Sequence, residues 1–145
     1  MKKILIPIDG SECSYRAMQK GKEIAEAFDS DIVLLNVNAW VPFIDEINVE
    51  NIAQMAEKSR EESEELLIEA KKYFKDRKDS VTVKTIDTVS LTGEVGKTIV
   101  QFAEENGIDL IVIGHRGRSG LDRLIMGSVT MKVLNYVDVP VLVVK

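Results

Sequence analysis

The chain has 145 residues, of which 45% are hydrophobic and 30% charged, and its formal net charge at pH 7 is −5. This length and composition indicate one globular domain over residues 1–145. There is no basic block and no apolar run near the roughly 20 residues that span a bilayer, so a nucleic-acid binder and a membrane protein are not expected.

Five short apolar runs alternate with segments of helical periodicity, which is typical of a parallel α/β sheet. The runs are Lys3–Ile8, Asp31–Val37, Val81–Asp87, Leu110–Gly114 and Val141–Val144. The first is continuously apolar over Ile4–Ile6 and the fourth over Leu110–Ile113, as in strands covered on both faces. The third alternates and is expected at or near a sheet edge. The first run has too short an apolar core for a signal peptide, so we expect a cytoplasmic protein.

Helices are predicted between these runs. Apolar stripes at helical spacing extend from Ala17 to Phe28, from Ile52 to Tyr73 and from Val95 to Ala103. Ser11 is a candidate N-cap for the first helix, and Asn106-Gly107 is a C-cap signal for the third. A fourth helix is predicted from near Gly127 to about Tyr136, before the last strand.

Two segments are given no function. The charged face of the second predicted helix, which includes Glu64 and Glu65, is interpreted as a solvated surface. The segment Asn38–Asn48 is predicted to be irregular and contains several apolar residues, including Trp40. Such a loop usually packs on its own domain or on a partner, and a lid over a ligand is the alternative.

The run that ends at Gly114 leads into a glycine-rich loop and then into a helix. Gly114 and Gly117 allow close backbone approaches that a β carbon would block. Gly127-Ser128 opens a helix whose N–H groups and positive dipole end suit an anion. Further candidate contacts are the hydroxyls of Ser128 and Thr130 and the guanidinium groups of Arg116, Arg118 and Arg123. The spacing Gly-x2-Gly-x9-Gly-Ser after a buried strand therefore predicts a nucleotide phosphate site, against the alternative of a tight turn followed by a simple helix cap.

This glycine string resembles the ATP-binding signature of universal stress proteins of the UspA type. The resemblance covers the whole chain, because Ile4–Ser11, Asp109–Gly114 and Val139–Val144 are similar to the family's first, fourth and last strands. It implies a Rossmann-like fold of the adenine nucleotide alpha hydrolase type. Its five-stranded parallel sheet would have the strand order 3-2-1-4-5 and helices on both faces.

The resemblance also implies which residues meet the nucleotide. Asp9 would face the ribose hydroxyls or a phosphate-bound Mg or Mn ion, and Val37 would hydrogen-bond the adenine through its backbone. The predicted nucleotide-binding residues are Pro7, Ile8, Asp9, Val37, Ile113, Gly114, Arg116, Gly117, Arg118, Gly127, Ser128, Val129 and Thr130. The alternative for Asp9 is a turn or capping acid in Asp9-Gly10-Ser11. No catalytic residue is assigned.

Three other signals are set aside. The segment 93–98 resembles a Walker A loop only in part, because that motif needs glycine where Leu91 stands, and Lys97 is expected on the outer face of a helix. His115 is the only histidine, which excludes a metal cluster of several histidines, and its side chain is expected to point away from a ligand. Cys13 excludes an internal disulfide, agrees with a reducing compartment and is interpreted as a plain small residue.

The leading functional hypothesis is a stress-response regulatory protein that binds ATP or a related adenine nucleotide (ADP, AMP) and acts as a homodimeric nucleotide-dependent switch on an unknown protein partner. A weak Mg- or Mn-dependent ATPase, or a nucleotidyl-transfer enzyme of the same fold, is the alternative. The strand Val141–Val144 is apolar and ends the sequence, so its edge is a candidate pairing surface. The family resemblance implies that two copies meet there. The choice among ATP, AMP and a cyclic nucleotide stays open.

Overall fold

A computed structural model of the chain describes residues 1–40, 49–89, 94–118 and 125–145. Within these ranges the strands are β1 (Lys3–Pro7), β2 (Asp31–Trp40), β3 (Val81–Val89), β4 (Leu110–Gly114) and β5 (Val141–Val144). They form one parallel sheet in the order β3-β2-β1-β4-β5. The predicted α/β fold and its strand order are confirmed, as is the position of the third strand at an edge.

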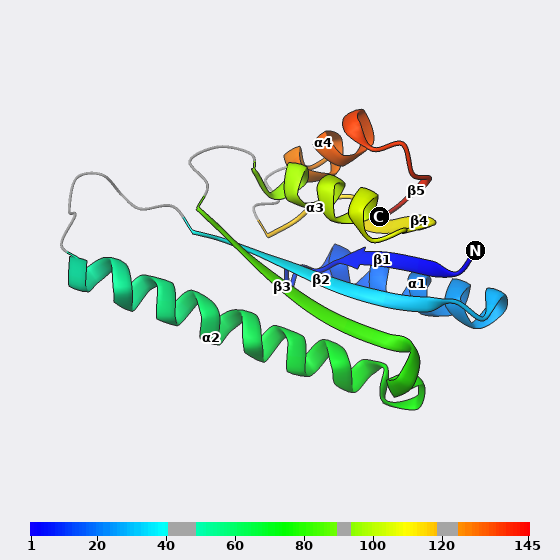
Figure 1. Ribbon diagram of the computed structural model, residues 1–145, viewed down its shortest axis with the longest axis horizontal. Coiled ribbons are helices and arrows are strands. Elements are labelled where there is room, and N and C mark those ends of the chain that lie inside the picture. The colour runs from blue at the N-terminus through cyan, green and yellow to red at the C-terminus, as the bar shows by residue number, and fades with distance from the viewer. Residues whose placement is uncertain (41–48, 90–93, 119–124) are drawn as a thin grey trace.

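Helices cover both faces of this sheet (Figure 1). They are α1 (Glu12–Phe28), α2 (Val49–Tyr73), α3 (Glu94–Glu105) and α4 (Ser128–Tyr136), with a short 3₁₀ segment, η2 (Lys75–Ser80), after α2. Successive strand residues point to opposite faces, so Ile4 and Ile6 pack in the core under α1 and α2, while Leu5 packs in the core under α3 and α4. No helix in the described ranges combines the length and the apolar character that a membrane span requires.

The helix ends follow the predicted signals. Ser11 caps α1 by accepting a hydrogen bond from the Ser14 backbone N–H at 3.1 Å. Gly107 follows α3 with a φ of +62°, a conformation that favours glycine. Gly127 is the N-cap of α4.

Some predicted boundaries and burial expectations were wrong. The strand β1 ends at Pro7, one residue before the predicted Ile8, and Tyr73 at the end of the second apolar stripe is 41% exposed. The strand β2 continues to Trp40, so Asn38–Trp40 is not irregular, and residues 41–48 lie outside the described part of the chain. The strand β3 likewise continues to Val89. The two strands pair without interruption to Trp40 and Val89, and these backbone hydrogen bonds extend them beyond the apolar core that guided the prediction. Phe28 is 61% exposed, because it lies in the last turn of α1 at the end of the stripe.

Candidate functional site

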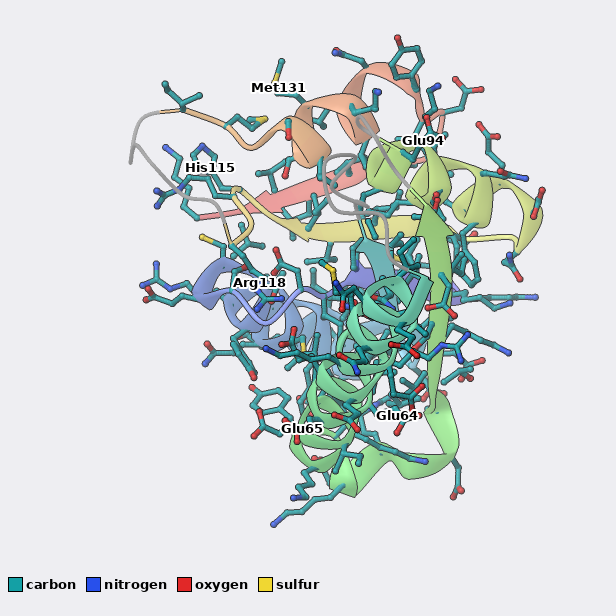
Figure 2. All side chains as sticks on the ribbon, turned by 90° about the vertical axis from the view of Figure 1, so that its left-hand side faces the viewer. Glu64, Glu65, Glu94, His115, Arg118 and Met131 are labelled. Carbon is teal, nitrogen blue, oxygen red and sulfur yellow. The ribbon has the colours of Figure 1, made fainter. Side chains whose placement is uncertain are left out.

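The carboxyl ends of the parallel strands lie at one edge of the sheet, where α/β proteins place their ligands. Figure 2 looks onto this side of the molecule and shows His115 on the side of α4 and Arg118 on the side of α1 and α2. Glu64 and Glu65 are both exposed on α2, as predicted for a solvated face. The candidate site is therefore built from the ends of the strands and the segments that follow them.

Asp9, just after β1, connects two backbone segments at this edge. One carboxylate oxygen, Oδ1, accepts a hydrogen bond from the Ser11 N–H at 3.0 Å. The other, Oδ2, accepts from the Arg118 N–H at 3.1 Å. The turn role considered for Asp9 is thus present, and the same carboxylate also holds the loop that follows β4.

The loop after β4 is fixed at both ends by backbone hydrogen bonds. The N–H of His115 donates to the carbonyl of Val144 in β5 at 2.6 Å, and the N–H of Gly127 donates to the carbonyl of His115 at 2.9 Å. Residues 119–124, which include Arg123, lie outside the described ranges. These contacts place the first turn of α4 directly beside the end of β4.

Thr130 and Ser128 differ in how their hydroxyls are used. The Thr130 side chain is buried, and its hydroxyl donates to the carbonyl of Gly114 at 2.8 Å. Its hydrogen is therefore engaged within the protein, contrary to the expectation that it adds a donor for phosphate. Ser128, the first residue of α4, is exposed at the edge of the site.

The predicted glycines are required by different neighbours. A β carbon on Gly114 would lie 2.8 Å from the carbonyl carbon of Cys13, so this glycine allows α1 to pack closely on β4. A β carbon on Gly117 would lie 2.5 Å from Asp9 Oδ2. At Gly127 it would lie 3.3 Å from the Cα atom of Arg116, which is tight but not prohibitive. Gly114 thus serves helix packing, whereas Gly117 and Gly127 keep the loop next to the site free of side chains.

Two connected hollows lie at this edge. An apolar cavity of about 90 Å³ lies mainly under α3 and α4 and is lined by Pro7, Ile8, Asp9, Ser14, Leu35, Val37, Val95, Ile99, Ile113, Gly114, Arg116, Gly117, Val129 and Thr130. A wider cleft of about 820 Å³ is lined by Asp9, Gly10, Asn36, Val37, Asn38, Ala39, Ser59, Glu62, Ser63, Leu66, Val95, Gly117, Arg118, Gly127, Ser128, Val129 and Thr130. Every predicted site residue lines the cavity, the cleft or both, so the structure brings the whole predicted set together.

Sequence reasoning missed one wall of the cleft. This wall is formed by Asn36 and Asn38 of β2 together with Ser59 and Ser63 of α2. The hydroxyl of Ser59 donates to the side-chain oxygen of Asn38, whose amide nitrogen donates to Asp87 Oδ1 at 2.9 Å. Two asparagines inside an otherwise apolar strand and two serines four residues apart in an apolar stripe were the available signal.

The signals that were set aside lie elsewhere. Gly96 is buried in α3 and packs against Lys132 of α4, and Lys97 is exposed and pairs with Glu94 at 3.5 Å. Neither feature belongs to a phosphate loop, which supports setting aside the Walker-like segment. His115 is buried and is not among the residues that line the cavity or the cleft. Cys13 lines neither the cavity nor the cleft but borders a further hollow of about 420 Å³, which shares Gly10, Gly117 and Arg118 with the cleft.

A metal centre made by the protein alone is not found in the parts of the chain that are described. No group of three or more histidine, cysteine, aspartate or glutamate residues gathers there with the arrangement of metal ligands. Asp9 and Glu62 are the acids that line the cleft. From the described residues, a divalent cation in the cleft would therefore have these two carboxylates as its candidate charged ligands.

Known proteins are similar to this chain in sequence. The universal stress protein MJ0531 of Methanocaldococcus jannaschii is 38% identical over 144 residues, which are 99% of this chain and 82% of that protein. The universal stress protein YxiE of Bacillus subtilis is 30% identical over 160 aligned positions, covering 99% of this chain and 98% of that protein.

Solved structures extend this likeness to the fold. The structure of the protein MJ0577 of M. jannaschii has a TM-score of 0.79 at 33% identity and covers 99% of this chain and 95% of that one. A universal stress protein in complex with cAMP has a TM-score of 0.69 at 22% identity, with 99% and 97% covered. One from Archaeoglobus fulgidus in complex with dAMP has a TM-score of 0.62 at 23% identity, with 100% and 98% covered.

The sequence model of the universal stress protein family (Usp) matches residues 1–145, the full length of the chain. Together with relatives at 30% identity or more over 99% of its length, this match shows that the chain belongs to the universal stress protein family.

Proposed function

We propose that this protein binds ATP or a related adenine nucleotide (ADP or AMP) in the cavity and cleft at the carboxyl edge of the sheet. The observation that carries the proposal is the juxtaposition of an apolar cavity, an acid and a helix N-terminus in one site. Val37, Asp9 and Ser128 mark these three parts, and all three line the cleft. An adenine nucleotide carries a flat base, a sugar and phosphates, which correspond in this order to the apolar cavity, the acid and the helix N-terminus.

The base is proposed to enter the apolar cavity. Leu35, Ile99 and Ile113 line it, and their apolar side chains exclude water from both faces of a planar ring. Val37 lies at its mouth, since it lines the cavity and the cleft. Its backbone is proposed to hydrogen-bond the edge of the adenine.

The phosphates are proposed to lie at the N-terminus of α4. The first N–H groups of a helix have no partner within the helix, and the dipole makes this end positive. Gly127, the N-cap, carries no side chain that could occupy the position of a phosphate. Arg116 and Arg118 contribute positive charge from the loop.

Asp9 lies between these two parts and is proposed to meet the sugar or a phosphate-bound Mg or Mn ion. One carboxylate fits a cation whose other ligands are phosphate oxygens and water, but not a cation held by the protein alone. The ion would neutralise phosphate charge. Both Asp9 oxygens accept hydrogen bonds from backbone N–H groups, which favours a binding role for this carboxylate over a role as a base that activates water.

Structures with the same fold support a nucleotide of this class, since one holds cAMP and another holds dAMP. We further propose that the protein is a homodimeric regulator of the stress response. The nucleotide would alter its interaction with a partner protein, and the two copies would pair through β5, which forms an edge of the sheet.

The test is isothermal titration of ATP, ADP, AMP and GTP into the wild type and into Gly127→Val. We expect adenine nucleotides to bind more tightly than GTP, and we expect the valine to lower ATP affinity by about tenfold or more by displacing phosphate from α4. Gly107→Val is the matched control. Its positive φ costs stability, but a β carbon there contacts nothing within 4 Å.

Equal ATP affinity in the wild type and in Gly127→Val would reject the site, and no binding by the wild type would reject the function. Turnover of ATP with Mg or Mn is measured in parallel. A rate above about one per second, lost in Asp9→Ala, would make the protein an ATPase or nucleotidyl-transfer enzyme instead of a regulator.

A further inference from the structure

Asn36 is a buried polar residue in an apolar strand. It lies on the face of β2 that carries Ile32 and Leu34, and its residue surface is only 6% exposed. The amide nitrogen Nδ2 donates to the carbonyl of Ile8 at 2.9 Å. The amide oxygen Oδ1 has no hydrogen-bond partner among the residues that the structure describes.

The hydrogen bond to Ile8 fixes the orientation of the Asn36 amide. The unpaired atom is therefore the amide oxygen, which is an acceptor. A carbonyl oxygen only accepts, so turning the amide over would place two oxygens against each other. A buried acceptor without a donor has lost its hydrogen bonds to water without replacement, which costs free energy. Oδ1 is itself enclosed by protein, so a bound molecule would recover that free energy by drawing the Asn36 side chain toward the cleft and donating to Oδ1.

The position of Asn36 limits which part of a nucleotide can reach it. Asn36 lines the cleft together with Asp9 and Gly10, on the α2 side of β2. The apolar cavity proposed for the base is lined instead by Leu35 and Val37, whose side chains point to the opposite face. Asn36 therefore lies beside the part of the cleft between base and phosphates, where the sugar would be.

The chemistry of the neighbours also favours a sugar hydroxyl. A phosphate at neutral pH offers acceptors, so it would meet the amide oxygen unfavourably. Each Asp9 oxygen accepts one backbone N–H and keeps a second acceptor site, so Asp9 and Asn36 can accept from different hydroxyls of the same sugar. The adjacent Asn38 is satisfied, because it accepts from Ser59 and donates to Asp87. Within the described part of this wall, Asn36 Oδ1 is the acceptor that still needs a donor.

We propose that Asn36 Oδ1 accepts a hydrogen bond from a ribose hydroxyl of the bound nucleotide, and that Asn36 thereby selects ribonucleotides over deoxyribonucleotides. This inference rests on the proposed adenine-nucleotide site. It adds a specificity-determining residue from β2 that the glycine string does not contain.

The test compares ATP, 2′-deoxy-ATP and 3′-deoxy-ATP by calorimetry in the wild type, Asn36→Ala and Asn135→Ala. The wild type is expected to prefer ATP over at least one deoxy analogue by about three- to tenfold, the effect of one hydrogen bond. In Asn36→Ala that preference disappears, because ATP binds more weakly while the analogue is unaffected. Asn135→Ala removes an exposed amide of α4 that lines neither the cavity nor the cleft, and it keeps the wild-type preference.

A second measurement does not depend on a variant that folds. In a structure of the wild-type protein with ATP, a ribose hydroxyl oxygen is expected at about 3 Å from Asn36 Oδ1. A ribose beyond hydrogen-bond reach, an equal affinity of the wild type for all three nucleotides, or an unchanged preference in Asn36→Ala would each overturn the inference. If ATP still bound and Gly127→Val still weakened it, the proposed function would stand. If none of the three nucleotides bound, both proposals would fail.

Discussion

Gly117 and Asp9 are held so close that a β carbon on Gly117 would lie 2.5 Å from Asp9 Oδ2. The same oxygen accepts the N–H of Arg118 at 3.1 Å. The end of β1 and the loop after β4 are thus joined by one carboxylate, and the glycine is what allows the contact. A substitution at either residue should therefore alter the contacts of the other.

Gly117→Ala is expected to push the Asp9 carboxylate away and break its hydrogen bond to the Arg118 N–H. The loss should lower the free energy of unfolding by about 1 kcal/mol in urea titrations. In an Asp9→Ala background the alanine meets no carboxylate, so its cost should nearly vanish. An equal cost in both backgrounds would show that Asp9 is not what Gly117 accommodates.

Gly114→Ala is expected to impair folding more than ligand binding. Its β carbon would lie 2.8 Å from a backbone atom of Cys13, and α1 and β4 would have to separate. Overpacking of this kind typically costs about 1–3 kcal/mol, which urea unfolding would measure. Gly127→Ala is the matched control, since its nearest contact is 3.3 Å and its φ of −64° suits any residue. A Gly114→Ala protein as stable as Gly127→Ala would contradict this assignment.

Asp109 is expected to make stability depend on pH in the acid range. Its carboxylate accepts the backbone N–H of Lys2 at 2.7 Å and that of Lys3 at 3.0 Å, and these bonds lower its pKa below the ordinary 3.8. Because the pKa is lower in the folded state, this stabilisation is complete above pH 3.8 and is lost as the pH falls toward the folded-state value.

Asp109→Asn should therefore lower stability at pH 7 and flatten the loss of stability below about pH 4. Urea midpoints of wild type and variant, measured at intervals from pH 7 to pH 2.5, would provide the comparison. Parallel curves over the whole range would mean that the Asp109 carboxylate does not contribute as described.

Leu142→Lys is expected to convert the proposed dimer into a monomer. Leu142 lies in β5 at the sheet edge and is 36% exposed, and a lysine there disfavours pairing with a second strand. Ile68→Lys, which replaces an exposed apolar residue of α2, is the control and should leave the dimer intact. Sedimentation velocity would measure the mass of the wild type and of each variant in solution. A monomeric wild type, or a Leu142→Lys protein that stays dimeric, would reject pairing through β5.

The features that were predicted from the sequence are those that local patterns encode. Continuous apolar runs identified the strands, and the glycine spacing identified the loop before α4. Residues as distant in the chain as Pro7, Val37 and Thr130 could be assigned to one site because the family resemblance implies it, which agrees with the rule that the carboxyl ends of parallel strands meet at one edge. The same rule could not tell which side of the edge would carry polar side chains.

The remaining features depend on packing between distant segments. Asn36 is an unfavourable residue for a buried strand unless the Ile8 carbonyl lies beside it. The serines of α2 belong to the cleft only because that helix lies along β2. The hydroxyl of Thr130 could not be assigned, because its partner is a carbonyl sixteen residues away in the chain.

The most direct test of the proposed site is a crystal structure of the protein with ATP and Mg. The account predicts adenine in the apolar cavity beside the Val37 backbone, and phosphates within hydrogen-bond distance of the N–H groups at the start of α4, next to Gly127 and Ser128. ATP bound elsewhere, or bound with its phosphates away from α4, would contradict it.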